Sequence, residues 1–216
     1  LKQGIFRELD QVCPGPVILA TNTSVMSVTQ IAAKALHKER IIGTHFWNPP
    51  YLIPLVEVVQ TLDTAPEVVE KTMAIMKGAG KKAIHVKKDV PGFVGNRMQH
   101  ALWREAFHIL DEGIADAQTI DQAIRHGFGL RLPQLGPMEN SDMIGLDLVL
   151  DIHEYILKFL CHDKKPSKSL QELVKKGQLG FKTKGQGFQS WSESEMNESK
   201  QGLNNYLINV ILQTTK

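Results

Sequence analysis

The sequence predicts an α/β layered domain with a largely parallel sheet, followed by an all-α domain. Residues 17–86 alternate short apolar strand patterns with helical patterns, which is typical of layered α/β domains. After Asp89 the helical period dominates, and Pro91-Gly92 marks a turn between the two regions. We therefore expect domains at residues 1–89 and 90–216.

Spacing, caps and β-branched runs predict the elements of the first domain in order. Apolar residues at helical spacing predict a helix over residues 1–9. Ser27 is a favoured N-cap residue and predicts a helix running to about His37. Pro66 lies near the start of a helix predicted over residues 63–79. The expected strands are 17–20, 41–46, 56–60 and 83–86.

The second domain shows helical periodicity without convincing strands. Gly113, Gly127 and Gly177 each close an apolar-periodic segment, as glycines at helix C-termini do. His153-Glu154 begins a metalloprotease-like HExxH pattern, but Leu157 replaces the second histidine, so no metal site is expected. The expected helices are 93–112, 119–126, 142–160, 167–176 and 200–212. Their apolar faces are too numerous for one small bundle, which predicts a homodimer formed through this domain.

Bulk properties limit the classes of partner. A net charge of +2 over 216 residues gives no argument for nucleic acid, and the paired lysines at 81–82 are expected on a solvated face. No apolar run approaches the roughly 18–20 residues that span a bilayer, so no membrane partner is expected. Cys13 and Cys161 stand apart without CxxC spacing, which favours a reducing, cytoplasmic setting.

The stretch 41–60 carries the most informative chemistry. Its two β-branched runs are separated by an irregular, proline-rich connection, with His45 at the end of the first run and Glu57 inside the second. A carboxylate among valines is costly to bury unless a partner holds it, and His45 on the neighbouring strand is a plausible partner. An imidazole held by a buried carboxylate serves as a general acid/base near neutral pH. Alternatively, His45 is structural and Glu57 faces solvent.

Other polar residues fall just past the predicted strands. Asn22, Ser24, His45 and Asn48 all follow strand ends, where ligands of layered α/β sheets bind. A GxGxxA pattern at 78–83 follows a helix and precedes a strand, the reverse of a dinucleotide loop, so we interpret it as a helix C-cap.

Six short motifs occur along the chain in a specific order. They are TNTS (21–24), GTHFWNP (43–49), LVEVV (55–59), PGFVGNR (91–97), GP followed by GLD (136–147), and GFKTKGQGF (180–188). Together they resemble the NAD-dependent L-3-hydroxyacyl-CoA dehydrogenase family. The resemblance implies a Rossmann-type domain of which only the C-terminal part is present, because family members begin with a strand, a GxGxxG loop and a helix that are not found here. It therefore implies an N-terminally truncated chain that is inactive alone and binds NAD poorly.

The resemblance also implies roles for individual residues. His45 resembles the family's catalytic acid/base, and Glu57 resembles the carboxylate that orients it. Ser24 and Asn96 resemble groups that contact the reacting oxygen and the thioester end of the substrate. The positions that resemble those around NAD are Lys2, Asn22, Ser24, Asn48 and Lys182.

Two further functions remain open. Trp47 and residues 127–134 also resemble relatives that act on small free hydroxy acids, such as carnitine or gulonate dehydrogenases. Arg131 in that segment would pair with a free carboxylate. A third possibility is a non-catalytic dimeric scaffold, since crystallins occur among the family's relatives.

Overall fold

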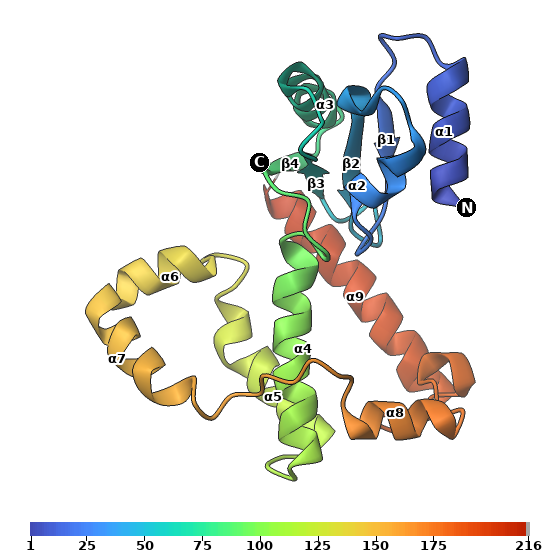
Figure 1. Cartoon of the computed structure of the whole chain (residues 1–216). Coiled ribbons are helices and arrows are strands. Elements are labelled where there is room, and N and C mark those ends of the chain that lie inside the picture. The colour runs from blue at the N-terminus through green and yellow to red at the C-terminus, as the bar shows by residue number, and fades with distance from the viewer. Residues whose placement is uncertain (215–216) are drawn as a thin grey trace. The chain divides into compact units, whose positions relative to one another are not determined.

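A computed structural model describes residues 1–214 of the chain (Figure 1). The chain forms two compact units, each considered by itself. The first is Leu1–Gln99 together with the segment from Gly202 onward, and the second is His100–Gln201. None of the helices in the described part of the chain combines the length and hydropathy that crossing a membrane requires.

A four-stranded sheet organises the first unit. Its strands are β1 (Leu19–Thr21), β2 (Ile41–Phe46), β3 (Leu55–Val59) and β4 (Lys82–Val86), in the order β1-β2-β3-β4. The outer pairings, β1 with β2 and β3 with β4, are parallel, so the prediction of a largely parallel sheet is confirmed. The central pairing of β2 with β3 is antiparallel, because the short connection between them holds no crossover helix.

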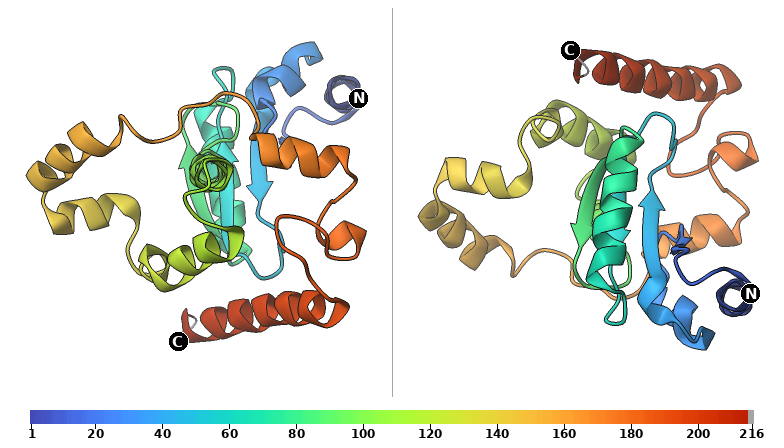
Figure 2. Two further views of the ribbon diagram at one scale, coloured as in Figure 1. Left: turned by 90° about the horizontal axis from the view of Figure 1, so that it is seen from below. Right: turned by 90° about the horizontal axis from the view of Figure 1, so that it is seen from above.

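Three helices accompany this sheet. They are α1 (Lys2–Val12), α2 (Val28–Ile31) and α3 (Pro66–Gly78), and Figure 2 shows α3 running alongside the strands. The predicted N-cap is confirmed, because the Ser27 side chain accepts a hydrogen bond from the Gln30 N–H. The predicted extension of this helix to His37 is wrong. The chain passes from α2 into two short 3₁₀ turns, Ala32–Lys34 and Lys38–Arg40.

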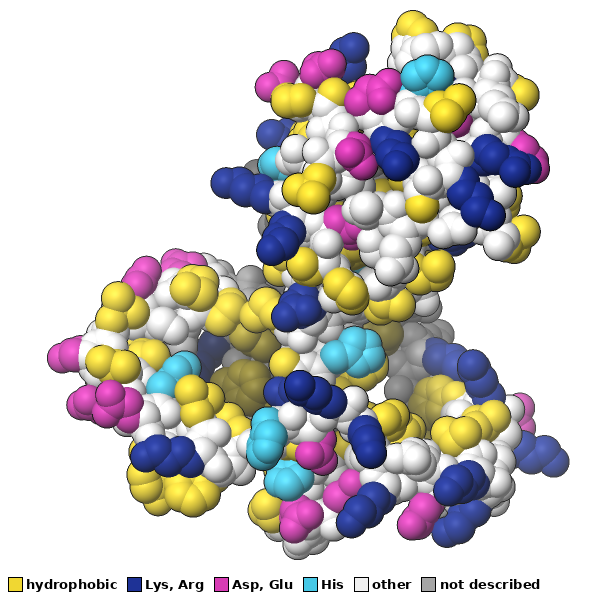
Figure 3. All heavy atoms as spheres, in the orientation of Figure 1, with side chains coloured by type: hydrophobic (Ala, Val, Ile, Leu, Met, Phe, Trp, Pro, Cys, Tyr) yellow, Lys and Arg dark blue, Asp and Glu magenta, His cyan; other side chains and the backbone are white. Residues whose placement is uncertain are grey.

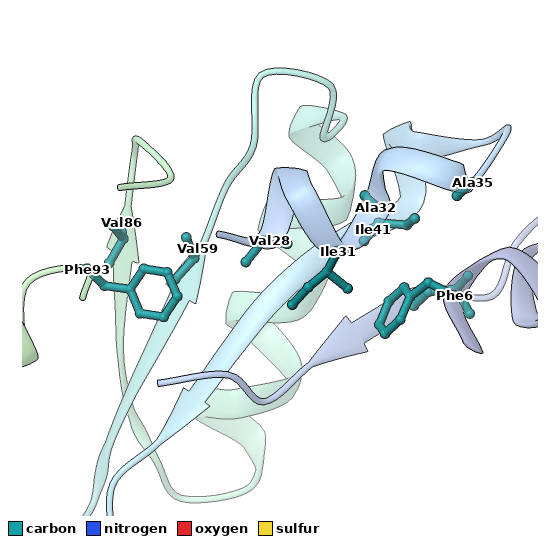
Figure 4. Packing of buried hydrophobic residues seen from close by; sticks show 10 residues of the cluster. Phe6, Val28, Ile31, Ala32, Ala35, Ile41, Val59, Val86 and Phe93 are labelled. Atoms are coloured by element: carbon teal, nitrogen blue, oxygen red, sulfur yellow. The ribbon is translucent and has the colours of Figure 1, made fainter. Parts of the chain in front are cut away.

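Apolar side chains form one core cluster on each face of the sheet. Ile41 belongs to one cluster and Ile42 to the other, as the two-residue period of a strand requires. The first cluster includes Phe6, Val28, Ile31, Val59 and Phe93, shown in Figure 4. The second includes Val56, Val58, Val68 and Val69. Helix α3 therefore packs on the face opposite to α2.

A buried ion pair fixes the segment after α2. Asp10 on α1 accepts hydrogen bonds from Arg40 Nε at 3.1 Å and Nη2 at 2.8 Å. The same carboxylate accepts the backbone N–H groups of Leu36 at 2.7 Å and His37 at 3.1 Å. Because these two N–H groups point at Asp10, they are not available to continue the predicted helix.

We expect Asp10→Asn to lower the free energy of unfolding at pH 7 by roughly 3 kcal/mol, because it leaves Arg40 buried without its counter-charge. Burial alone raises the pKa of Asp10, but the hydrogen bonds from Arg40 and from backbone N–H groups outweigh it and lower the pKa from 3.8 to about 2. The folded pKa lies below the unfolded one, so this stabilisation is complete above 3.8 and is lost as the pH falls through 2.

Urea unfolding between pH 2 and 7 measures this effect. The exposed Glu8, changed to Gln, is the control on the same helix and should leave stability nearly unchanged. A stability of the Asp10→Asn variant equal to that of wild type at pH 7 would show that the ion pair contributes nothing.

The second unit contains helices without strands. Its elements are α4 (Gly95–Asp111, which begins in the first unit), α5 (Ala117–His126), α6 (Pro137–Ile144), α7 (Leu146–Ile156), α8 (Lys168–Lys175) and α9 (Glu193–Thr214, which ends in the first unit). The single helix predicted over 142–160 is wrong. Gly145 separates α6 from α7. Its φ of +103° is a backbone conformation that residues with side chains rarely adopt. The last helix is longer than the predicted 200–212.

The second unit lacks a buried core of its own. Among residues 100–201, all of which are described, Gly185 is the one buried residue. Large apolar side chains are exposed on α6 and α7, among them Met143, Leu150, Ile152 and Tyr155. Figure 3 shows apolar side chains at the surface between charged ones. Because burial of apolar surface is favourable, the exposed apolar side chains of α6 and α7 form a surface on which a partner could pack.

Candidate active site

His45 and Glu57 form a directly opposed cross-strand pair. The antiparallel register of β2 and β3 places His45 opposite Glu57, and their side chains lie on one face of the sheet. His45 Nδ1 lies 2.7 Å from Glu57 Oε2. The side chains are 5% and 0% exposed, so the alternative that Glu57 faces solvent is wrong.

Four N–H groups converge on the Glu57 carboxylate. Oε1 accepts the backbone N–H groups of Val94 and Gly95, each at 3.0 Å. Oε2 accepts His45 Nδ1 and, at 3.3 Å, Trp47 Nε1. Val94 and Gly95 stand at the N-terminus of α4, the end that carries partial positive charge and free backbone donors. Glu57 therefore binds His45 with one oxygen and caps α4 with the other.

These contacts determine the charge of Glu57. Burial alone raises the pKa of Glu57, but the hydrogen bonds from Gly95, His45 and Val94 outweigh it and hold the pKa below its ordinary value. The carboxylate is therefore ionised at neutral pH and acts only as an acceptor. It follows that His45 carries a proton on Nδ1, and in the neutral ring Nε2 is left with a lone pair.

Two aromatic rings lie beside the imidazole. The Trp47 ring centroid lies 5.5 Å from that of His45, and the Phe93 centroid lies 5.8 Å from it, both tilted. Phe93 is 1% exposed and has a φ of +50°, an uncommon conformation for a bulky residue. Its burial in the core offsets the cost of that conformation and keeps its ring against His45.

The polar residues after β1 meet the end of β2. Asn22 Oδ1 accepts the backbone N–H of Phe46 at 3.2 Å, and Lys2 Nζ lies 3.4 Å from the Asn22 carbonyl. Asn96 Nδ2 donates to the Ser24 carbonyl at 2.8 Å. The structure thus brings four of the predicted site residues, Lys2, Asn22, Ser24 and Asn96, to the end of the sheet where β2 closes with Phe46, the residue after His45.

A lysine that we expected on a solvated face instead fastens the connection between β2 and β3. Lys81 Nζ donates to the carbonyl groups of Pro50 and Ile53, the latter at 3.2 Å. It also lies 5.9 Å from the centroid of the Phe46 ring. The connection contains Asn48, which is exposed and precedes a cis proline. Nothing local in the sequence distinguishes Lys81 from its exposed neighbour Lys82.

Lys182 is the one predicted cofactor residue that belongs to the second unit. It lies in a 3₁₀ turn, Phe181–Thr183, of the second unit and is exposed. Its place near the cofactor stays a prediction.

The groups at this edge fit a dinucleotide. Asn22 and Ser24 are exposed after β1, Asn48 is exposed after β2, and the Lys2 ammonium lies beside Asn22. Amide, hydroxyl and ammonium groups at strand ends suit the amide, ribose and phosphate groups of such a ligand.

Two family models match successive parts of the chain. The model described as 3-hydroxyacyl-CoA dehydrogenase, NAD binding domain, matches residues 1–90. The model described as 3-hydroxyacyl-CoA dehydrogenase, C-terminal domain, matches residues 92–191.

Individual relatives are similar over most of the chain. A probable 3-hydroxybutyryl-CoA dehydrogenase of Bacillus subtilis is 39% identical over 89% of the chain and 66% of its own length. An L-carnitine dehydrogenase of Streptomyces griseus is 42% identical over 67% of the chain and 43% of its own length. The chain therefore spans less than two thirds of the length of these relatives.

Among solved structures, a 5-formyl-3-hydroxy-2-methylpyridine 4-carboxylic acid 5-dehydrogenase, described as an NAD⁺-dependent dismutase, matches with a TM-score of 0.92 at 29% identity. The match covers 97% of this chain and 67% of that one.

Proposed function

Because this chain belongs to the 3-hydroxyacyl-CoA dehydrogenase family, we propose that it carries the acid/base pair of an NAD-dependent dehydrogenase that oxidises an L-3-hydroxyacyl-CoA to the 3-ketoacyl-CoA. His45 is the acid/base and Glu57 is its orienting carboxylate. The observation that supports this proposal best is the fully buried Glu57 with His45 Nδ1 at 2.7 Å, which leaves Nε2 as the base.

The proposed chemistry divides between cofactor and protein. NAD supplies the hydride acceptor. His45 Nε2 takes the proton of the 3-hydroxyl group, and the Glu57 carboxylate stabilises the positive charge that the imidazole gains. Glu57 itself keeps its charge, because its hydrogen bonds hold its pKa below the ordinary value. In the reverse direction His45 returns the proton to the keto oxygen.

The remaining site residues complete the proposal. Ser24 and Asn96 contact the reacting oxygen and the thioester end of the substrate. Residues 1–89 are the C-terminal portion of the nucleotide-binding domain, and residues 90–216 are the helical domain. The positions proposed around the cofactor are Lys2, Asn22, Ser24, Asn48 and Lys182. A cytoplasmic location is part of the same proposal.

We also propose that the helical domain forms a homodimer. The α7 side chains Leu148, Ile152 and Tyr155 follow one helical face and are 50%, 49% and 68% exposed. A second copy would bury them, which supplies the core that residues 100–201 lack by themselves.

We expect Ile152→Glu to weaken the dimer by at least tenfold, because a carboxylate buried in an apolar interface is costly. Light scattering coupled to gel filtration measures the mass as the protein is diluted. Asp151→Asn, at an exposed position of the same helix, is the control and should remain a dimer. A wild-type protein that stays monomeric at high concentration would contradict the proposal.

A small free hydroxy acid is the second candidate substrate. Two similar proteins favour it: the L-carnitine dehydrogenase, and the solved structure whose name specifies a carboxylic acid. Arg131 is exposed just after a 3₁₀ turn, Phe128–Leu130, and its guanidinium would bind such a carboxylate in a bidentate manner.

The experiment that separates these functions is NADH formation by the protein carrying the nucleotide loop that the family resemblance predicts. The substrates are 3-hydroxybutyryl-CoA, 3-hydroxybutyrate, carnitine and gulonate. We expect the CoA thioester to give the highest kcat/KM. A preference for carnitine or gulonate would support the second candidate. Binding of NAD without turnover would contradict the substrate classes, and failure to bind NAD would favour a scaffold.

A further inference from the structure

Trp47 directly follows β2 and shares an acceptor atom with His45. Its indole Nε1 lies 3.3 Å from Glu57 Oε2, the same oxygen that lies 2.7 Å from His45 Nδ1. Its ring also lies beside the imidazole, with centroids 5.5 Å apart. One side chain therefore contacts both members of the proposed acid/base pair.

Trp47 completes the set of hydrogen-bond donors around the Glu57 carboxylate. An ionised carboxylate offers about four lone-pair positions, two on each oxygen. The backbone N–H groups of Val94 and Gly95 occupy both positions on Oε1. His45 and Trp47 occupy both positions on Oε2. Because Glu57 is 0% exposed, bulk water does not fill a position that Trp47 leaves empty.

A glycine leaves the space that the indole ring occupies. A Cβ atom added at Gly95 would overlap the Trp47 ring, so the absence of a side chain at this position lets the ring approach α4. The N–H of the same glycine donates to Glu57 Oε1. Gly95 thus holds one oxygen of the carboxylate and leaves space for the side chain that holds the other.

We propose that Trp47 is a positioning residue for the His45–Glu57 pair, fixing Glu57 Oε2 through its indole N–H. This inference rests on the proposed function. The N–H shares the charge of Oε2 with His45 and prevents rotation of the carboxylate away from the imidazole. A phenylalanine at this position keeps an aromatic ring against Gly95 and His45 but has no donor. The hydrogen bond of Trp47 can therefore be separated from the packing of its ring.

Two replacements of Trp47 test the proposal. Trp47→Phe removes the donor and shortens the ring, whereas replacement by β-(3-benzothienyl)alanine removes the donor and keeps the bicyclic shape. Trp103→Phe is the matched control. Trp103 also lies against a histidine, His100, with ring centroids 5.0 Å apart, but among the described residues its indole N–H donates to no carboxylate. Melting temperatures establish that each variant folds.

Two measurements distinguish positioning from packing. In the protein carrying the nucleotide loop, both replacements should lower kcat by roughly 3- to 20-fold, since a long hydrogen bond to a carboxylate contributes a modest amount, with KM changed less than about twofold. In the present chain, the NMR resonance of the His45 Nδ1 proton should move downfield, because Oε2 loses a competing donor and binds His45 more strongly. Trp103→Phe should change neither.

The outcomes separate this inference from the proposed function. An unchanged His45 resonance and kcat in the benzothienyl variant would show that Trp47 only packs, and would overturn the inference. A downfield shift in a protein that oxidises none of the tested substrates would overturn the proposed function, and with it the positioning role in catalysis, while leaving the hydrogen bond established. The shift together with the fall in kcat supports both.

Discussion

Replacement of His45 by glutamine is expected to lower kcat by roughly 10²- to 10⁴-fold, the contribution of a positioned general base. Glutamine retains a polar side chain of similar reach but has no group that takes a proton near neutral pH. KM should change little, because the proposed role of His45 lies in proton transfer and not in binding. Initial rates of NADH formation in the protein carrying the nucleotide loop measure both constants.

The control for this variant is His85→Gln. His85 lies on β4 of the same unit, is exposed, and hydrogen-bonds Gln60 at 2.9 Å. It should leave kcat within about twofold of wild type. A His45→Gln variant that retains more than a tenth of the wild-type kcat would show that another group accepts the proton.

Replacement of Glu57 by glutamine is expected to lower both activity and stability. An amide presents one oxygen and one NH₂ group, whereas the site holds N–H donors against both carboxylate oxygens. Whichever way the amide is turned, its NH₂ group faces a donor. The variant should lose roughly 2–4 kcal/mol of unfolding free energy, the cost of buried polar groups left unpaired. Because His45 loses its fixed orientation, kcat should fall by roughly 10²-fold.

Kinetics and urea unfolding of the same preparation separate the two effects. Glu70→Gln is the control, because Glu70 is exposed on α3 and its removal should affect neither quantity. Loss of activity without loss of stability would show that the backbone N–H groups of Val94 and Gly95 find other partners. If neither activity nor stability falls, Glu57 does not contribute to the site.

Elements that depend on a local residue pattern can be predicted from the sequence alone. The apolar runs of β2 and β3 and the Ser27 cap all lie where their residue types predict. The helix expected to reach His37 is interrupted because Asp10, distant in sequence, binds the N–H groups that would continue it. The periodicity over 142–160 continues across Gly145, so the pattern concealed a break that backbone conformation creates.

Part of the site was also predictable from the sequence. A carboxylate within a valine-rich strand requires a partner, and His45 at the end of the neighbouring strand is a candidate that the sequence alone provides. The other donors to Glu57 were not predictable. Two are backbone N–H groups, which every residue but proline carries, and the third is an indole whose direction depends on the turn after β2. Lys81 was missed for the same reason, because its partners are carbonyl groups.

The tautomer of His45 is the most direct test of the central claim, that an ionised Glu57 holds the imidazole so that Nε2 is the base. Long-range ¹H–¹⁵N correlation spectra of the chain, recorded at a pH where the ring is neutral, report which nitrogen carries the proton. We predict a proton on Nδ1 in the wild type and a change in the tautomer population in Glu57→Gln. A proton on Nε2 in the wild-type protein would contradict the claim, because Nε2 would then have no lone pair to receive the proton of a substrate.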